Sequence, residues 1–355
     1  MHTRYLFIGL VSIGLIILGV GCSQEVTPAV TATPSIEAQW ESIVVPSPHR
    51  FFYLSKDLRW LIYAKAETPD SKEYSAWLAD IANGKLTDSV MIADSTHDKL
   101  FRSMGYSPDG AYFVLETMAK EDVFSLWIVN VHNLQDKRLL DTVQTHAGYV
   151  IWSPNSERFA VITMKWGADV VDINGNIHHE VVPAGTFSKI MAEVSWSPDS
   201  KQVVYTNLEK TSMDGGDVWI ADVDTGKKRI LTEVLVIAQP FWSPTGKSIA
   251  LVESRDANIK VVNLDGEVQQ TIELGEPPQY GTIIWSPDGT RLAFFAKEKT
   301  GAAYVGVITL ATGEIHKIPM ENITEILQWS ADGQAVIVYA RSEQMDTLLR
   351  VPIIP

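Results

Sequence analysis

The chain has 355 residues, of which 46% are hydrophobic and 20% charged, and its formal net charge is −14 at pH 7. A nucleic-acid backbone is held by clustered Lys and Arg, so this acidic balance argues against DNA or RNA as a partner. The single cysteine, Cys22, excludes an intrachain disulfide and a zinc site built from cysteines.

The N-terminus carries the features of an export signal. Arg4 precedes an apolar run at residues 5–18, which is short for a membrane span, and small residues then lead to Cys22. This end resembles the bacterial lipobox, although Gly19 stands where Leu, Val or Ile is usual. Residues 1–21 are therefore predicted to be a lipoprotein signal peptide, with a palmitate-type lipid on Cys22. An uncleaved anchor helix is the alternative.

Residues 22–39 are rich in Thr, Pro, Ala and Ser and show no apolar periodicity. This composition predicts a flexible tether. Together with the lipid, it predicts a domain anchored to the cell membrane or the outer membrane and facing the periplasm or the exterior.

A repeat follows, centred on the pentapeptide Trp-Ser-Pro-Asp-Gly. Its aromatic residue stands at positions 106, 152, 196, 242, 285 and 329, so the steps are 46, 44, 46, 43 and 44 residues. A degenerate first copy begins at Leu54. A period in the low forties is typical of four-stranded propeller blades. The predicted repeats start near residues 50, 101, 147, 191, 237, 280 and 324.

Each copy has the same local pattern of strands and turns. An apolar stretch enters the aromatic residue, Ser-Pro-Asp-Gly makes a turn, and three further short apolar stretches follow without helical periodicity. Hairpin signals such as Asn83-Gly84 and Asp265-Gly266 separate the third stretch from the fourth. Residues 40–355 are thus predicted to be an all-β, seven-bladed β-propeller of four-stranded antiparallel blades. Six blades remain possible if the Leu54 copy is not a full blade.

The two ends of this domain complement each other. The last copy supplies only three strands, at its motif, at residues 335–340 and at residues 347–352, whereas residues 40–45 form a spare strand before the first copy. An open outer edge invites aggregation. We therefore expect the N-terminal strand to close the last blade. The motif tryptophans are expected to pack between neighbouring blades rather than to bind a ligand.

The repeated Ser-Pro-Asp-Gly unit resembles the WD-repeat-like propeller of the TolB family and is similar to the propellers of prolyl-oligopeptidase-type enzymes. The resemblance covers about residues 48–353. TolB proteins also carry an α/β domain ahead of the propeller, for which residues 23–39 are too few, so the resemblance does not extend to TolB's partner lipoprotein. The Gly-x-Ser-x-Gly elbow of the peptidases does not occur in the sequence.

Metal and cofactor motifs are not found. The histidines lack His-Glu-x-x-His spacing, and no EF-hand or phosphate loop appears. No metal and no cofactor is predicted, and the motif aspartates are interpreted as turn residues, with calcium binding as the lesser alternative. Polar residues before the motif aromatics are expected near the channel mouth, either as a binding site or merely in contact with water. They are Arg50, Arg102, His146, Glu193, Gln239 and Glu325.

The leading interpretation is a monomeric, non-enzymatic binding module. Its protein, peptide or glycan partner would sit on the face that carries the irregular loops, because recognition concentrates on loops held by a rigid scaffold. Those loops are residues 67–75, 117–125, 207–217 and 297–302. Three alternatives stay open: an enzyme with carboxylates or histidines gathered at the channel mouth, a structural envelope protein, and a regulatory propeller for a separate enzyme.

Overall fold

The residues that the computed structural model describes form the propeller part of the chain. Two units divide the chain, Met1–Pro34 and Ser35–Pro355, and every described residue belongs to the second. Cys22, the predicted signal peptide and tether, and Glu193 lie outside the described residues. The described residues are 41–45, 49–66, 74–83, 85–94, 101–120, 123–140, 145–163, 165–187, 194–207, 216–234, 238–253, 257–275, 278, 283–342 and 346–353.

The described part of the chain is all β. Its 28 strands form seven four-stranded antiparallel sheets, and no helix occurs among the described residues. The prediction of seven four-stranded blades is confirmed, and the copy at Leu54 is a complete blade.

The first four blades take their strands in chain order. These strands are β2 (His49–Leu54), β3 (Trp60–Ala66), β4 (Tyr74–Ala82), β5 (Lys85–Asp94); β6 (Phe101–Tyr106), β7 (Tyr112–Lys120), β8 (Val123–Asn130), β9 (Asn133–Leu140); β10 (Thr145–Trp152), β11 (Arg158–Thr163), β12 (Ala168–Asp172), β13 (Ile177–Val182); and β14 (Val194–Trp196), β15 (Gln202–Asn207), β16 (Gly216–Asp222), β17 (Lys228–Val234).

The last three blades complete the series. Their strands are β18 (Ala238–Trp242), β19 (Ser248–Glu253), β20 (Asn258–Asn263), β21 (Val268–Glu273); β22 (Ile284–Trp285), β23 (Arg291–Lys297), β24 (Ala303–Thr309), β25 (Glu314–Met320); and β26 (Ile323–Trp329), β27 (Ala335–Arg341), β28 (Asp346–Pro352) with β1 (Ser42–Val45).

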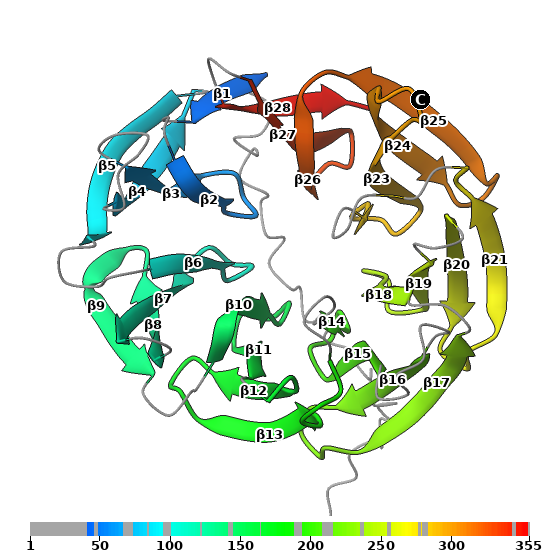
Figure 1. The fold of residues 1–355 in the computed structure, drawn as a ribbon, viewed down its shortest axis with the longest axis horizontal. Coiled ribbons are helices and arrows are strands. Elements are labelled where there is room, and N and C mark those ends of the chain that lie inside the picture. The colour runs from blue at the N-terminus through cyan, green and yellow to red at the C-terminus, as the bar shows by residue number, and fades with distance from the viewer. Residues whose placement is uncertain are drawn as a thin grey trace, which may run out of the picture. The chain divides into compact units, whose positions relative to one another are not determined.

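Within this unit the sheets follow one another in chain order around a central axis (Figure 1). The first strand of each blade, from β2 to β26, lies nearest the axis, and the fourth strand lies outermost. The central axis is therefore bordered by the segments that lead into the repeated motif.

The seventh blade takes its outer strand from the N-terminal side. β1 pairs antiparallel with β28, with Ser42 opposite Leu349 and Val45 opposite Asp346. This is the closure expected from the sequence. Side chains alternate along the strand, because Ile43 and Val45 are each 1% exposed whereas Val44 is 54% exposed.

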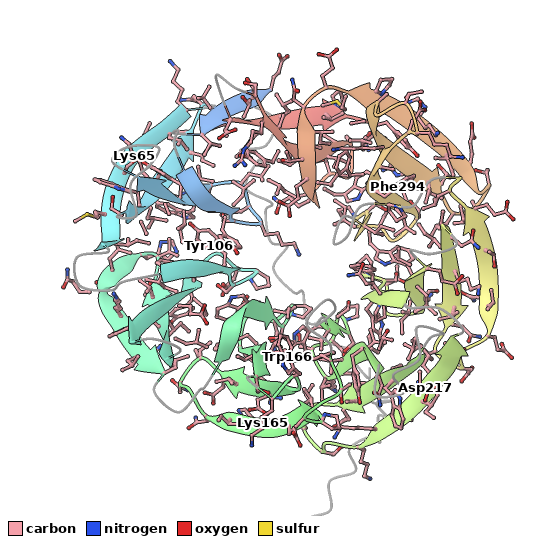
Figure 2. All side chains as sticks on the ribbon, in the orientation of Figure 1. Lys65, Tyr106, Lys165, Trp166, Asp217 and Phe294 are labelled. Carbon is pink, nitrogen blue, oxygen red and sulfur yellow. The ribbon has the colours of Figure 1, made fainter. Side chains whose placement is uncertain are left out.

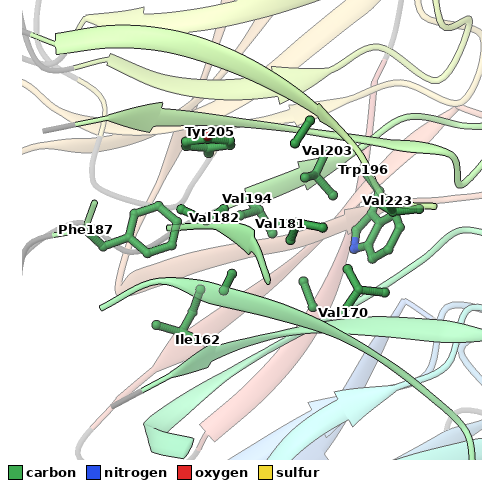
Figure 3. Packing of buried hydrophobic residues seen from close by; sticks show 13 residues of the cluster. Ile162, Val170, Val181, Val182, Phe187, Val194, Trp196, Val203, Tyr205 and Val223 are labelled. Carbon is green, nitrogen blue, oxygen red and sulfur yellow. The ribbon is translucent and has the colours of Figure 1, made fainter. Parts of the chain in front are cut away.

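The core lies between neighbouring sheets rather than within one of them. In the cluster of Figure 3, Ile162 and Val170 of the third blade pack against Trp196 and Tyr205 of the fourth. Each seam buries apolar side chains of two blades, so each sheet depends on its neighbours for stability.

The blades present two distinct faces. At one face, which we call the motif face, the motif turns lie beside the hairpins that join third to fourth strands; Leu310 N–H, for example, donates to Thr290 O at 3.0 Å. At the other, the loop-rich face, the second-to-third-strand loops lie beside the connections between blades, as the bond from Arg341 N–H to Asn322 O (2.8 Å) shows.

Candidate functional site at the mouth of the central channel

Each motif turn is closed by its serine hydroxyl. In the fourth copy, Ser197 Oγ donates to Asp199 Oδ1 at 2.6 Å and accepts the N–H of Gln202 at 2.9 Å. The bond from Ser197 lowers the pKa of the Asp199 carboxyl. The same side-chain pairing joins Ser55 to Asp57, Ser107 to Asp109, Ser153 to Asn155, Ser243 to Thr245, Ser286 to Asp288 and Ser330 to Asp332. The motif carboxylates are thus engaged in building turns.

The fifth motif position takes a left-handed backbone in every copy. Glycine reaches this conformation without strain, but three copies use other residues: Leu58 (φ 58°), Ser156 (φ 63°) and Ser200 (φ 61°). The serines add a contact between blades, because Ser156 Oγ accepts the N–H of Asp109 at 3.0 Å. Leu58 is fully buried in the cluster at the closing seam.

Tryptophan side chains bridge most of the seams. The indole N–H of Trp196 donates to Ile151 O of the preceding blade at 2.9 Å, and those of Trp285 and Trp329 donate to Phe241 O and Ile284 O at 3.0 and 3.1 Å. Trp152 makes the same bond to Gly105 O at 3.2 Å. The expectation that the motif tryptophans pack between blades is confirmed.

Three seams depart from this pattern. The indole nitrogen of Trp242 is buried and has no hydrogen-bond partner among the described residues. In the second blade Tyr106 replaces tryptophan between the first and second sheets (Figure 2), and burial raises the pKa of its phenol well above the ordinary value. At the first copy, Leu54 carries no donor, and Gln328 Nε2 instead donates to Lys56 O at 3.1 Å.

A cavity of about 530 Å³ opens where the motifs converge on the axis. Because its walls are motif residues, it lies on the motif face. The third to seventh blades and the first supply the walls, whereas the second supplies none of them. The lining residues are Lys56, Pro154, Ser195, Trp196, Pro198, Phe241, Trp242, Pro244, Ile283, Ile284, Trp285, Pro287, Leu327, Gln328 and Trp329.

The walls of this cavity are mainly apolar. Proline, tryptophan and other apolar side chains make up most of the lining, and the polar lining residues are Lys56, Ser195 and Gln328. Trp196, Trp242 and Trp329 are only 6–7% exposed, so their ring faces are covered by the neighbouring blades. Apolar walls with a few polar groups are typical of sites that hold apolar side chains or small ligands.

The sequence did not lead us to this cavity. Its residues are spread from Lys56 to Trp329, and only closure of the ring brings them together. The available signal is the proline after four of the five motif tryptophan-serine pairs, which by itself indicates only a turn. The prolines of four consecutive copies line the cavity.

The predicted channel residues lie on the innermost strands where they are described. Arg50, Arg102 and His146 lie on β2, β6 and β10, while Gln239 and Glu325 lie on β18 and β26. Of the two whose side chains are described, neither Gln239 nor Glu325 lines the motif-face cavity.

Two of these residues have described side chains. Gln239 is buried at 7% exposure. Glu325 retains contact with water on the inner strand, but the protein around it displaces enough solvent to raise the pKa of its carboxyl. Their assignment to a binding site stays a prediction.

A second, more open cavity of about 680 Å³ lies on the loop-rich face. It borders the β23–β24 turn and the connection from β25 to β26, and Lys297 and Glu321 are its charged residues. This turn belongs to one of the four loops predicted to carry recognition; parts of the other three lie outside the described residues.

No cluster of three or more metal-ligating side chains occurs within the described ranges. The same part of the chain contains no helix of the length and apolarity needed to cross a membrane.

Comparison with known proteins gives one family and several related structures. The TolB beta propeller domain matches residues 162–351, more than half of the chain. Dipeptidyl-peptidase 5 of Porphyromonas gingivalis is 24% identical over 251 residues, which are 66% of this chain and 36% of that protein. The chain thus spans about a third of that relative's length.

Three solved structures share the fold at low identity. A chain of the mitotic checkpoint complex matches with a TM-score of 0.62 and 16% identity over 100% of both chains. Oligogalacturonate lyase of Vibrio parahaemolyticus matches with a TM-score of 0.57 and 12% identity over 82% of this chain and 84% of that one. An oligogalacturonate lyase in complex with manganese matches with a TM-score of 0.54 and 14% identity over 68% of this chain and 70% of that one. At such identities the likeness establishes the propeller fold alone.

Proposed function

The chain belongs to the family of TolB β-propeller domains, and from that premise we propose that it is an extracytoplasmic, lipid-anchored module that binds a peptide segment of a partner protein. A lipid on Cys22 holds the domain at a membrane. The partner's apolar side chains enter the motif-face cavity, while Lys56 and Gln328 offer hydrogen bonds at its wall.

The composition of the cavity wall carries this proposal. Proline, tryptophan and aliphatic side chains give an apolar surface that releases water when an apolar side chain is inserted. The walls stand on seven interlocked sheets, so little conformational entropy is lost on binding. Three of the four lining tryptophans are buried, which favours a peptide over a glycan, because a sugar ring is held by stacking on an open aromatic face.

The exposed motif prolines allow a direct test. Pro154 and Pro287 line the cavity, whereas Pro108 occupies the same turn position in the second blade and does not. Pro287→Glu and Pro154→Glu place a carboxylate on the apolar wall, and Pro108→Glu is the matched control. Peptides selected from a display library on the detergent-solubilised full chain should bind wild type and Pro108→Glu equally. Binding to either wall variant should be about tenfold weaker, or about 1.4 kcal/mol.

Selected peptides that bind Pro287→Glu as tightly as wild type would place recognition elsewhere and contradict the proposal. A library that yields no specific peptide would favour a structural role in the envelope instead.

The anchoring has its own test. Cells that express the chain are labelled with an alkyne analogue of palmitate, and the chain should take up label and partition with membranes. Cys22→Ser should lose both properties. Retention of the label by Cys22→Ser would contradict lipidation at this residue.

A further inference from the structure

The motif-face cavity carries a single charged group. Among the described residues that line it, Lys56 is the only charged one. It stands at the motif position that proline occupies in the second to sixth blades, and the prolines of the third to sixth blades line the same cavity. One cation beside apolar walls suits a ligand that carries one negative charge next to an apolar group.

The surrounding protein leaves the Lys56 ammonium available. The side chain is exposed, and no described carboxylate forms an ion pair with it. The adjacent acid, Asp57, is engaged in its own turn, where Oδ1 accepts Ser55 Oγ at 2.5 Å and the N–H of Arg59 at 3.1 Å. Its Oδ2 lies beside Gly110, 3.7 Å from where a Cβ on that glycine would stand. Asp57 therefore lies against the second blade, which contributes no wall to the cavity.

A hydrogen-bond acceptor lies at the same end of the cavity. Gln328 Nε2 donates to Ser55 O and Lys56 O, at 3.4 and 3.1 Å, and so joins the seventh blade to the first. The carboxamide oxygen of Gln328 has no hydrogen-bond partner within the described part of the chain, and the residue lines the cavity. A C-terminal residue offers the complementary groups, because its carboxylate and its backbone N–H stand on one Cα.

We propose that the motif-face cavity binds the free C-terminus of a partner peptide whose last residues are apolar. The terminal carboxylate pairs with the Lys56 ammonium, and the last backbone N–H donates to the carboxamide oxygen of Gln328. The apolar side chains contact Phe241 and the motif prolines. Capture of a terminal carboxylate is a recurring mode of peptide recognition. This inference rests on the proposed peptide site and names the part of the peptide that it recognises.

A chain end suits this cavity better than an internal acidic residue does. In a C-terminal residue the charge and the apolar side chain are attached to one Cα, so both reach the wall together. An internal Asp or Glu carries its charge in place of an apolar side chain, and its peptide must both enter and leave the cavity. Hydrogen bonds from the motif serines lower the pKa of Asp199 and Asp288, so these carboxyls are anionic at neutral pH and repel further acidic side chains.

Synthetic hexapeptides in three forms test the proposal. Each ends in two residues chosen from Leu, Ile, Val and Phe, and it is made with a free carboxylate, with a C-terminal amide, or with an added C-terminal glutamate amide. Binding to the detergent-solubilised full chain is measured by fluorescence anisotropy. Wild type should bind the free-carboxylate form about fivefold more tightly than either amide form, as expected for one solvent-accessible ion pair. High salt should reduce this preference.

Variants of one lysine separate charge from other effects. Lys56→Gln should reduce the preference to less than about twofold, whereas Lys56→Arg should retain it. Lys247→Gln is the matched control, because Lys247 is an exposed lysine beside the motif turn of the fifth blade and does not line the cavity. It should bind all three forms as wild type does.

The outcomes distinguish this inference from the proposed function. Equal binding of free and amidated peptides, equally tight binding of the glutamate amide, or an unchanged preference in Lys56→Gln would overturn recognition of the C-terminus but leave a peptide site in place. If no form binds wild type, or if all forms bind Pro287→Glu as tightly as wild type, the cavity is not a peptide site and both proposals fail.

Discussion

The seams between blades differ in how they are stabilised. Between the second and fourth blades, and between the fifth and seventh, a motif tryptophan spans each seam and donates its indole N–H to the preceding blade. Around the first blade the motif is weaker. Leu54 and Tyr106 replace tryptophan there, and the contacts come from Gln328 and from the added strand β1.

This contrast shows that a repeat can degenerate where other parts of the chain supply the lost contacts. The closing seam buries Ile43 and Val45 of β1 together with Leu58 and Ile337. Backbone pairing and apolar burial thus replace an indole at the point where the ring must close. The first blade contributes only Lys56 to the motif-face cavity, and the second contributes no residue.

The closing strand should give the largest effect on stability. Ile43→Ala with Val45→Ala removes two fully buried aliphatic side chains, for an expected loss of about 3–6 kcal/mol in the free energy of unfolding. Urea unfolding monitored by tryptophan fluorescence measures the loss. Val44→Ala is the matched control, because Val44 is 54% exposed and its truncation should change stability by less than about 0.5 kcal/mol. Equal effects of the two variants would mean that β1 does not hold the ring closed.

The tryptophan seams can be compared with one another. Trp196 and Trp242 are buried to similar extents, but only Trp196 has a partner for its indole N–H among the described residues. Substitution by phenylalanine removes similar volume from both. Trp196→Phe should therefore lower the free energy of unfolding by about 1 kcal/mol more than Trp242→Phe does. This difference is the typical contribution of one hydrogen bond to stability. Equal losses in chemical unfolding would show that the indole bonds do not stabilise the seams.

The sequence was sufficient for the fold because the information is local and repeated. Ser197 and Asp199 close their own turn, and the same short pattern recurs clearly in six blades and in degenerate form at Leu54, so periodicity predicts a ring of repeated sheets. The motif-face cavity needed the structure, because its wall joins residues as distant as Lys56 and Trp329. The contact of Gln328 with Lys56 O is likewise non-local, and nothing in the residues around Gln328 indicates it.

Substitution of Tyr106 tests whether its buried hydroxyl destabilises the seam between the first and second blades. Its hydroxyl is buried without a hydrogen-bond partner among the described residues, and desolvation raises its pKa. An unpartnered buried hydroxyl destabilises the fold, so Tyr106→Phe should leave stability unchanged or raise it by up to about 1 kcal/mol. The melting temperature and urea midpoint measure this change. A clear loss of stability would show that the hydroxyl makes a contact with a residue outside the described ranges.

The smallest expected effect is on stability at acidic pH. The third blade shows that asparagine can take the place of the motif aspartate. Asn155 replaces aspartate there and still accepts the serine hydroxyl at 2.7 Å, so aspartate-to-asparagine substitution preserves the turn. In three other blades the bond from the motif serine lowers the pKa of the carboxyl, at Asp199, Asp288 and Asp332. A carboxyl whose pKa is lowered by folding stabilises the protein above its unfolded pKa of about 3.9, and this contribution is lost as the pH falls toward the folded value. The triple variant Asp199→Asn, Asp288→Asn, Asp332→Asn should accordingly lose less stability than wild type between neutral pH and pH about 3. Urea midpoints of both proteins at the two pH values measure the difference. If the stability difference between wild type and the triple variant does not narrow on acidification, the motif carboxylates do not couple turn formation to proton binding.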